Sequence, residues 1–372
     1  MGNGQLRPIL RRSVILKSGV LMKVSVLLCT YNGASRLPAT LQTLAAQELS
    51  SNFSWELLLI DNASTDQTAV VATNAAATFP APVRVLHESR PGKANALQTA
   101  FREAQGQYYC IVDDDNLLDP DYLANGIAFL DDHPDVASIG GRTFPQFPEG
   151  IAPPHDFDAT YSDLLACRDH GSDIIWNVRP PGAGQMGRLS LMRAIYSQIG
   201  TRLEDRVADG VGCCEDLEKG CICTSLGWRT THVPTLRLYH VLTERRLTEV
   251  YIDRLACAAV STIPWLRLIS GEEPNVAARH FLYGIADICR VIKYWGLSFV
   301  PTRMHPKLRR VHFWRRFYAA RANGYFSLIQ DRKRIGAMFA AIEQASTDLR
   351  PPESAMSCAE TRLLRKPART TS

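Results

Sequence analysis

The 372-residue sequence predicts an α/β protein in which helices flank a mostly parallel sheet. Two observations predict this fold class. Short apolar runs alternate along the chain with stretches of helical periodicity, and these runs are continuous, as is typical of strands covered on both faces. In addition, polar residues gather where the apolar runs end, which is the edge at which open α/β sheets bind ligands.

The elements follow one another in a regular order. Helices are expected near residues 37–45, 93–104, 120–130 and 191–199, and Ser64 or Thr65 is expected to cap a further helix after the second strand. Strands are expected at residues 24–29, 55–60, 83–86, 108–112 and 136–140. This alternation is that of strands joined by crossover helices.

Three consecutive carboxylates, Asp113, Asp114 and Asp115, end the expected strand at residues 108–112. Like charges this close repel one another unless a cation or hydrogen-bond donors compensate them. Oxygen ligands suit Mg²⁺ or Mn²⁺, which keep several waters and bridge to substrate phosphates. The pattern therefore predicts a site for a metal-bound diphosphate. The alternative is a solvated acidic turn ahead of the helix near Pro120.

Two further residues at element ends fit such a ligand. Lys93 stands at a helix start, where its charge opposes the helix dipole, so it indicates an anion to bind; an exposed surface lysine is the alternative. Asp61 ends the second strand, where it can accept hydrogen bonds from a nucleotide base or ribose. Because no glycine-rich dinucleotide or P-loop motif follows any strand, the diphosphate is expected to be held through metal.

A second acidic group occurs a hundred residues later. Glu215 and Asp216 stand at an expected helix start, with Asp209 and Glu218 nearby. The helix dipole favours their ionised form, and ordinary helix-start charges are the alternative interpretation. Between residues 142 and 181 the pattern loosens into clustered prolines, aspartates and aromatic residues, which is typical of a substrate loop.

Together these stretches resemble a family 2 glycosyltransferase with a GT-A fold. The resemblance covers about residues 23–254 and is carried by residues 26–32, 60–66, 92–97, 112–116, 214–218 and 227–240. It implies an inverting, metal-dependent enzyme of polysaccharide biosynthesis. Such an enzyme transfers a single sugar from a nucleotide-diphosphate-sugar, here expected to be a UDP-sugar, to a hydroxyl acceptor on a cell-surface or lipid-linked glycan.

The resemblance also implies roles for individual residues. Asp216 matches the catalytic base, with Glu215 beside it. Asp115 matches the direct ligand of Mn²⁺ or Mg²⁺, with Asp113 framing the D-x-D motif and His240 near the metal or diphosphate. For His240, a strand-end histidine satisfied by backbone is the alternative. The residues implied in donor binding are Thr30, Asn32, Asp61, Lys93, Asp113 and Asp114.

One departure from related enzymes bears on the product. Processive members carry a Gln-x-x-Arg-Trp motif and several membrane spans, whereas residues 244–247 here read Glu-Arg-Arg-Leu. Single-sugar transfer is therefore favoured over polymer extrusion. A non-catalytic, membrane-associated binding partner in a glycan assembly complex is the alternative function. A nucleotidyltransferase is less favoured, because its glycine-rich basic loop is missing after the first strand.

Outside the resemblance we expect an extension at residues 1–22, a helical region at residues 255–346 and a disordered tail at residues 347–372. Charged residues interrupt an apolar helical stripe and exclude a transmembrane helix. The run at residues 307–321 is basic and aromatic, which suits either anionic lipid or a packed helix with a solvated basic face; no nucleic-acid motif accompanies it. The stripe comprises Leu282, Ile285, Ile288, Ile292, Trp295 and Phe299, and the interrupting charges are Arg279, Asp287, Arg290 and Lys293.

The ten cysteines are scattered through expected strands and helices, and no signal peptide precedes them. Cys213, Cys214, Cys221 and Cys223 match no standard zinc spacing. This usage predicts a reduced, cytoplasmic compartment. The protein is therefore expected in the cytoplasm. Peripheral attachment to the cytoplasmic face of the inner membrane is the alternative.

Overall fold

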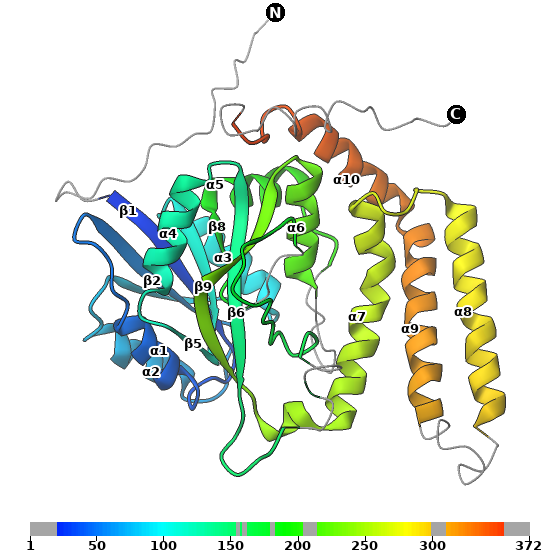
Figure 1. Cartoon of the computed structure of the whole chain (residues 1–372), viewed down its shortest axis with the longest axis horizontal. Coiled ribbons are helices and arrows are strands. Elements are labelled where there is room, and N and C mark those ends of the chain that lie inside the picture. Colours follow the sequence, from blue (N-terminus) through cyan, green and yellow to red (C-terminus); the bar gives the residue numbers. More distant parts are fainter. Residues whose placement is uncertain are drawn as a thin grey trace, which may run out of the picture.

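The computed structural model describes residues 21–153, 157, 162–178, 183–203, 214–298 and 310–352 (Figure 1). Within these ranges the chain forms a mixed sheet flanked by helices, followed by a helical C-terminal region. The predicted α/β class is confirmed. The extension up to residue 20, most of the expected tail, Asp209 and Cys213 lie outside the described residues.

The first half of the sheet is parallel, as predicted. Its strands run in the order β3-β2-β1-β4, and their register places the ends of β1, β2 and β4 side by side, with Thr30 opposite Asp61 and Cys29 opposite Asp113. The polar residues that follow these strands therefore meet at one edge. The elements are β1 (Leu21–Thr30), α1 (Leu37–Ala45), β2 (Phe53–Asp61), α2 (Thr68–Ala76), β3 (Val83–His87), α3 (Lys93–Glu103) and β4 (Tyr108–Asp113).

The second half mixes directions. β8 pairs antiparallel with both β4 and β6, while β6 and β9 are parallel, and β5 and β7 pair antiparallel with β9. The pairing of Asn116 with His240 brings the turn after β4 beside the end of β9. The elements are β5 (Asn116–Leu118), α4 (Tyr122–Asp132), β6 (Val136–Gln146), β7 (Ile175–Trp176), β8 (Met186–Arg188), α5 (Leu189–Ala194), a π-helical turn (Ile195–Ile199), α6 (Glu215–Ser225) and β9 (Arg229–Val241).

The predicted cap of α2 is wrong. The helix begins at Thr68, and the Asp66 carboxylate accepts the hydrogen bond from the Thr68 backbone N–H at 3.0 Å. Ser64 instead accepts a hydrogen bond from the backbone N–H of Asn32 at 3.0 Å. Its hydroxyl joins the loops after β1 and β2, so it is not available to the helix.

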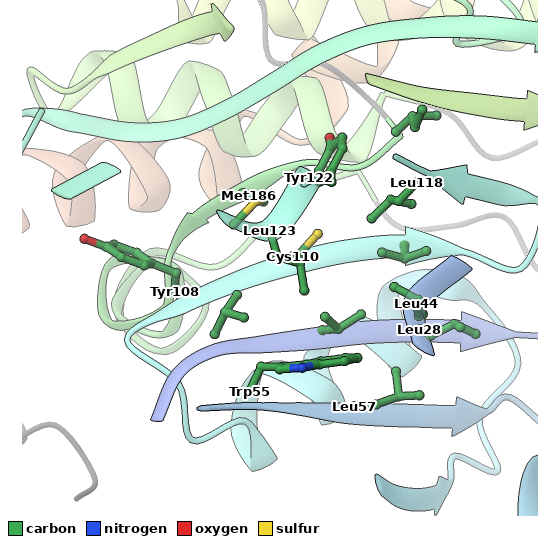
Figure 2. Close-up of a cluster of buried hydrophobic side chains, with 14 of the residues drawn as sticks. Leu28, Leu44, Trp55, Leu57, Tyr108, Cys110, Leu118, Tyr122, Leu123 and Met186 are labelled. Carbon is green, nitrogen blue, oxygen red and sulfur yellow. The ribbon is translucent and has the colours of Figure 1, made fainter. Parts of the chain in front are cut away.

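The central strands are covered on both faces. Leu28 and Leu57 face a cluster that includes Trp55 and Met186, shown in Figure 2, while their neighbours Leu27 and Leu58 belong to a separate cluster against α3 and α5. All of these side chains are buried. Burial on both faces explains why the apolar runs are continuous rather than alternating.

The C-terminal helices continue the fold without a break, and residue 254 lies inside α7. The Trp265 indole N–H on α7 donates to Oε1 of Glu218 on α6 at 2.7 Å, and residues from α6, α7, α9 and α10 share one apolar cluster. Helix α9 lies between α7 and α8 (Figure 1). No helix among the described residues is long and apolar enough to cross a membrane. The elements are a 3₁₀ turn (Glu244–Leu247), α7 (Glu249–Ile269), α8 (Ala277–Leu297), α9 (Val311–Gln330) and α10 (Arg332–Ala345).

Candidate active site

Asp114 is held by internal partners in the turn between β4 and β5. Arg36 donates from Nε to Oδ1 at 2.9 Å and from Nη2 to Oδ2 at 2.8 Å, and the Thr30 hydroxyl donates to Oδ2 at 2.5 Å. Gly33 permits this approach, because an added Cβ would lie only 2.3 Å from Oδ2. The carboxylate thus ties the end of β1 to the turn after β4, and both of its oxygens are engaged.

Asp115 is buried beside the side chains of His240 and Arg246, which are more than a hundred residues away in the sequence. Arg246 Nη2 lies 2.8 Å from Oδ2, and His240 Nε2 lies 3.5 Å from Oδ1. Burial alone would raise the pKa of Asp115, but the imidazole of His240 and the charges of Arg246 and Lys93 lower it to about 2. Asp115 is therefore ionised and held in one orientation.

His240 has a defined orientation. Its Nδ1 lies 2.8 Å from the carbonyl oxygen of Leu165, which can only accept, so Nδ1 carries the proton. Nε2 then faces Asp115 and Arg246, whose Nη1 lies 2.5 Å away. A backbone carbonyl that fixes the tautomer in this way is the usual support of a histidine metal ligand. His240 is thus both hydrogen-bonded to a backbone carbonyl and directed toward Asp115.

The pair formed by Asp115 and His240 offers ligand types that a divalent cation accepts, and in this structure Arg246 contacts both of them, at Asp115 Oδ2 and His240 Nε2. One carboxylate oxygen and one imidazole nitrogen are acceptable ligands for Mn²⁺ or Mg²⁺. Within the ranges that the structure describes, no three histidine, cysteine, aspartate or glutamate side chains converge on a common point. A cation at Asp115 would therefore take further ligands from water and from a substrate's phosphates, as Mg²⁺ commonly does.

Glu215 and Asp216 open α6, as predicted, directly after Cys214 with its left-handed φ of 73°. Burial and the neighbouring Glu215 charge raise the pKa of Asp216. Burial would also raise the pKa of Glu215, but the charges of Lys219 and Lys93 lower it. Neighbouring carboxyl groups whose pKa values move apart are typical of acid–base sites, and Asp216 is the more basic of the two.

Lys93 connects the two acidic groups. Its Nζ lies 2.5 Å from Oδ1 of Asp113, and its charge also lowers the pKa values of Asp115, Glu215 and Asp216. Burial by itself would lower the pKa of Lys93, but the charges of Asp113 and Glu215 raise it above its usual value. One ammonium group, paired with Asp113, therefore lies near enough to carboxylates a hundred residues apart in sequence for its charge to favour their ionised forms.

Asn32 and Asp61 connect the loops after β1 and β2. Asn32 Oδ1 accepts a hydrogen bond from the Thr65 backbone N–H at 2.8 Å, and Asp61 Oδ1 accepts one from the Ser64 backbone N–H at 3.2 Å. Asp61 Oδ2 lies 3.6 Å from His87 Nδ1. These side chains set the shape of the strand ends beside the three aspartates.

Asn62 and Glu88 position the loop before Lys93, and neither was predicted as a site residue. Asn62 Nδ2 donates to the carbonyl oxygens of Glu88 and Arg90, and Asn62 Oδ1 accepts from the Gly92 N–H at 2.7 Å. The Glu88 carboxylate accepts from Arg90 and from a buried threonine hydroxyl on α3. The signal was an amide directly after Asp61 at a strand end.

The fold and the site define a class of protein. An α/β sheet with a D-x-D turn, a lysine beside it and a carboxyl pair of separated pKa values suits an enzyme that binds phosphate-bearing donors and abstracts a proton. Residues 25–185 match the family described as Glycosyl transferase family 2. Over this region the chain is similar to that family, as its sequence predicts.

Relatives are similar over the same part of the chain. The poly(ribitol-phosphate) beta-N-acetylglucosaminyltransferase TarS of Staphylococcus aureus is 27% identical over 132 residues, which are 34% of this chain and 23% of that protein. The putative glycosyltransferase EpsE of Bacillus subtilis is 30% identical over 119 residues, 32% of this chain and 42% of that protein. The matches thus span less than half the length of these relatives.

Solved structures with a similar course of the chain are less similar in sequence. TarS 1-349 of S. aureus in complex with UDP-GlcNAc is 16% identical, with a TM-score of 0.45 over 82% of this chain and 92% of that one. The mannosyltransferase PcManGT of Pyrobaculum calidifontis in complex with GDP-Man and Mn²⁺ is 19% identical, with a TM-score of 0.48 over 92% of this chain and 78% of that one. At such distances no substrate carries over.

Proposed function

We propose that the protein is an inverting, metal-dependent glycosyltransferase that moves a single sugar from a nucleotide-diphosphate-sugar to a hydroxyl acceptor. The observation that carries the proposal is that Lys93, paired with Asp113, is close enough to Asp115, Glu215 and Asp216 for its charge to act on all three. The family match and the glycosyltransferase relatives support sugar transfer. We expect a UDP-sugar as the donor and a cell-surface or lipid-linked glycan as the acceptor.

The donor is proposed to bind along the strand ends. Lys93 supplies a positive charge for the diphosphate, and Asp61 accepts hydrogen bonds from the base. Because the oxygens of Asp114 are engaged by Arg36 and Thr30, Asp113 is the carboxylate that we assign to the ribose. Thr30 and Asn32 then act by holding the loops around the donor.

The chemistry is a single displacement. The acceptor hydroxyl attacks the anomeric carbon and gives its proton to Asp216, while the bond from that carbon to the phosphate oxygen breaks and the nucleotide diphosphate leaves with the electron pair. The raised pKa of Asp216 favours proton acceptance, and Glu215 remains ionised beside it. One displacement inverts the anomeric centre.

Asp115 and His240 are the residues proposed to hold Mn²⁺ or Mg²⁺. When bound, the cation would stabilise the charge that develops on the departing diphosphate. Arg246 adds a positive charge next to Asp115 in the same place. We also propose a peripheral position on the cytoplasmic face of the membrane.

The proposal is tested by separating donor binding from turnover. Nucleotide sugars are first screened by thermal shift with and without Mn²⁺, because a ligand of the folded state raises the melting temperature. The hit is then used to assay Asp115→Ala and Asp216→Asn, with the exposed helix-end variant Asp132→Asn as the matched control.

Asp216→Asn is expected to lower kcat about 10²- to 10⁴-fold while donor affinity stays near that of the wild type, because a general base acts in the transition state. Asp115→Ala is expected to weaken metal-dependent donor binding. If turnover survives both changes, the proposal is wrong. A wild-type protein that binds a donor but neither hydrolyses nor transfers it would instead be a non-catalytic binding partner.

A further inference from the structure

Helix α8 is packed with its polar side inward. Its buried residues are His280, Gly284 and Asp287, which lie one turn apart against α9. The Asp287 carboxylate is 1% exposed and accepts two hydrogen bonds of 2.7 Å from Arg321 of α9. Gly284 lets the helices approach, since an added Cβ would lie 2.6 Å from the Phe326 ring. The contact with α9 thus combines these polar and small residues with aromatic pairs, among them Phe281 with Phe326 and Tyr294 with Tyr318.

An adjoining side of α8 is apolar and exposed. Five of its six residues, from Phe281 to Trp295, are spaced four, three, four and three apart, and Leu282 directly follows the first of them. Each is between 37% and 64% exposed. We call this surface the α8 apolar face. It comprises Phe281, Leu282, Ile285, Ile288, Ile292 and Trp295.

A helix on the surface of a soluble protein usually buries its apolar stripe, whereas α8 leaves its apolar stripe exposed. In the sequence, Asp287 interrupts the apolar stripe. In the structure it points to α9, so no acidic side chain breaks the α8 apolar face. Contiguous exposed apolar surface of this kind marks an interaction site. From Phe281 to Trp295 the face extends over about 21 Å of the helix.

The charges on the rest of α8 favour one occupant. The exposed charged residues of the helix are Arg279, Arg290 and Lys293, and all are basic; Arg290 is also paired with Asp287. Residues two apart lie on opposite sides of a helix, so Arg290 faces away from Ile288 and Ile292, and the basic residues form the polar side. A helix with an apolar side and a basic polar side suits an anionic bilayer, because the phosphates attract the basic residues while the acyl chains accept the apolar side chains.

We propose that α8 is a membrane-docking helix that lies flat in the interface of an anionic bilayer, with Ile285, Ile288 and Ile292 toward the acyl chains. The proposal rests on the peripheral placement given above and assigns it a surface and a lipid class. It does not depend on sugar transfer, because vesicle binding needs no donor.

The experiment is co-sedimentation of the full chain with vesicles of mixed phosphatidylglycerol and phosphatidylcholine, and with phosphatidylcholine alone. The test variant is Ile285→Ser with Ile292→Ser, and its matched control is Val70→Ser with Val250→Ser, which are exposed valines on α2 and α7. We expect the wild type and the control to bind the anionic vesicles and the test variant to bind at least tenfold more weakly. Thermal melting checks that all variants remain folded.

A charge reversal tests the lipid class. Lys293→Glu changes the charge by two units. At about 1 kcal/mol for each unit, binding to the anionic vesicles is expected to weaken about thirtyfold. Arg102→Glu, on α3, is the control. Equal binding of the α8 variants and the wild type would overturn the assignment of this face while leaving the peripheral placement intact. A wild type that ignores vesicles but dissociates from dimer to monomer on Ile285→Ser would show that a second copy covers the face, and would overturn both.

Discussion

The contacts of Asp114 predict that it acts through the fold rather than through the donor. Arg36→Met retains most of the side chain but removes both hydrogen bonds to Asp114. The Asp114 side chain is 10% exposed, so its charge would be left with the Thr30 hydroxyl as a remaining donor. Removing one partner of a buried ion pair costs about 3–5 kcal/mol. Because the Arg36 side chain is 34% exposed, we expect about 2–3 kcal/mol.

That loss converts to a measurable shift. At about 2.1 cal/mol/K per residue, a chain of 372 residues has an unfolding entropy of about 0.8 kcal/mol/K, so the melting temperature should fall by about 3–4 °C. Asp114→Asn should cost less, since the amide oxygen can still accept from Thr30. The double variant should be more stable than the two single losses predict, because no unpaired charge remains.

The assay pairs thermal melting with donor binding by calorimetry. Asp114→Asn is expected to change donor affinity less than about threefold, whereas Asp113→Asn is expected to weaken it about tenfold, the loss of about one charge-assisted hydrogen bond. The reasoning fails if Arg36→Met and Asp114→Asn leave the melting temperature unchanged and weaken donor binding instead. That result would place Asp114 against the nucleotide.

Three further predictions address other parts of the molecule. Lys93→Met should weaken donor binding at least tenfold by calorimetry, because the cation shared by both acidic groups is lost; Arg102→Met, exposed on the same helix, should not. Glu88→Gln should lower the free energy of unfolding in urea by an amount that depends on pH. Hydrogen bonding from Arg90 lowers the pKa of Glu88 from 4.5 to about 2, so the wild type should be more stable than the variant above pH 4.5, and this difference should disappear as the pH falls toward 2. A loss of stability that is independent of pH would contradict the prediction. Gly284→Val should destabilise the chain by about 1–3 kcal/mol in urea unfolding, because its side chain would overlap the Phe326 ring, and an unchanged midpoint would mean that α8 shifts freely on α9.

The parallel half of the sheet could be predicted because its signal is local. Leu27 and Leu28 face opposite clusters, so the strand reads as a continuous apolar run without knowledge of its neighbours. The reversal of direction at β8 could not be predicted. That strand has three residues, and its entry depends on Gly184, where a Cβ would lie 2.3 Å from the Tyr122 hydroxyl oxygen on α4. Only the folded packing shows that constraint.

The same distinction holds for the site. Its carboxylates are visible in the sequence because three adjacent aspartates at a strand end are unusual. Their cations are not, since Arg36 lies 78 residues from Asp114 and Arg246 follows a different strand from Asp115. For α8 the sequence shows the apolar stripe, but which side is buried depends on the contact of Asp287 with Arg321, which no periodicity shows.

The charge balance of the site leads to a last prediction, on the order of binding. Five carboxylates, those of residues 113, 114, 115, 215 and 216, face the four cations Arg36, Lys93, Lys219 and Arg246, so the site is close to neutral before any ligand binds. The diphosphate adds about two negative charges in a nucleotide-diphosphate-sugar and about three in UDP, most of which a divalent cation offsets. Metal and nucleotide should therefore bind cooperatively, each strengthening the other by the same factor. Calorimetry with Mn²⁺ alone, UDP alone and both together measures that factor, and tight binding of Mn²⁺ without nucleotide would show that the internal cations do not balance the carboxylates.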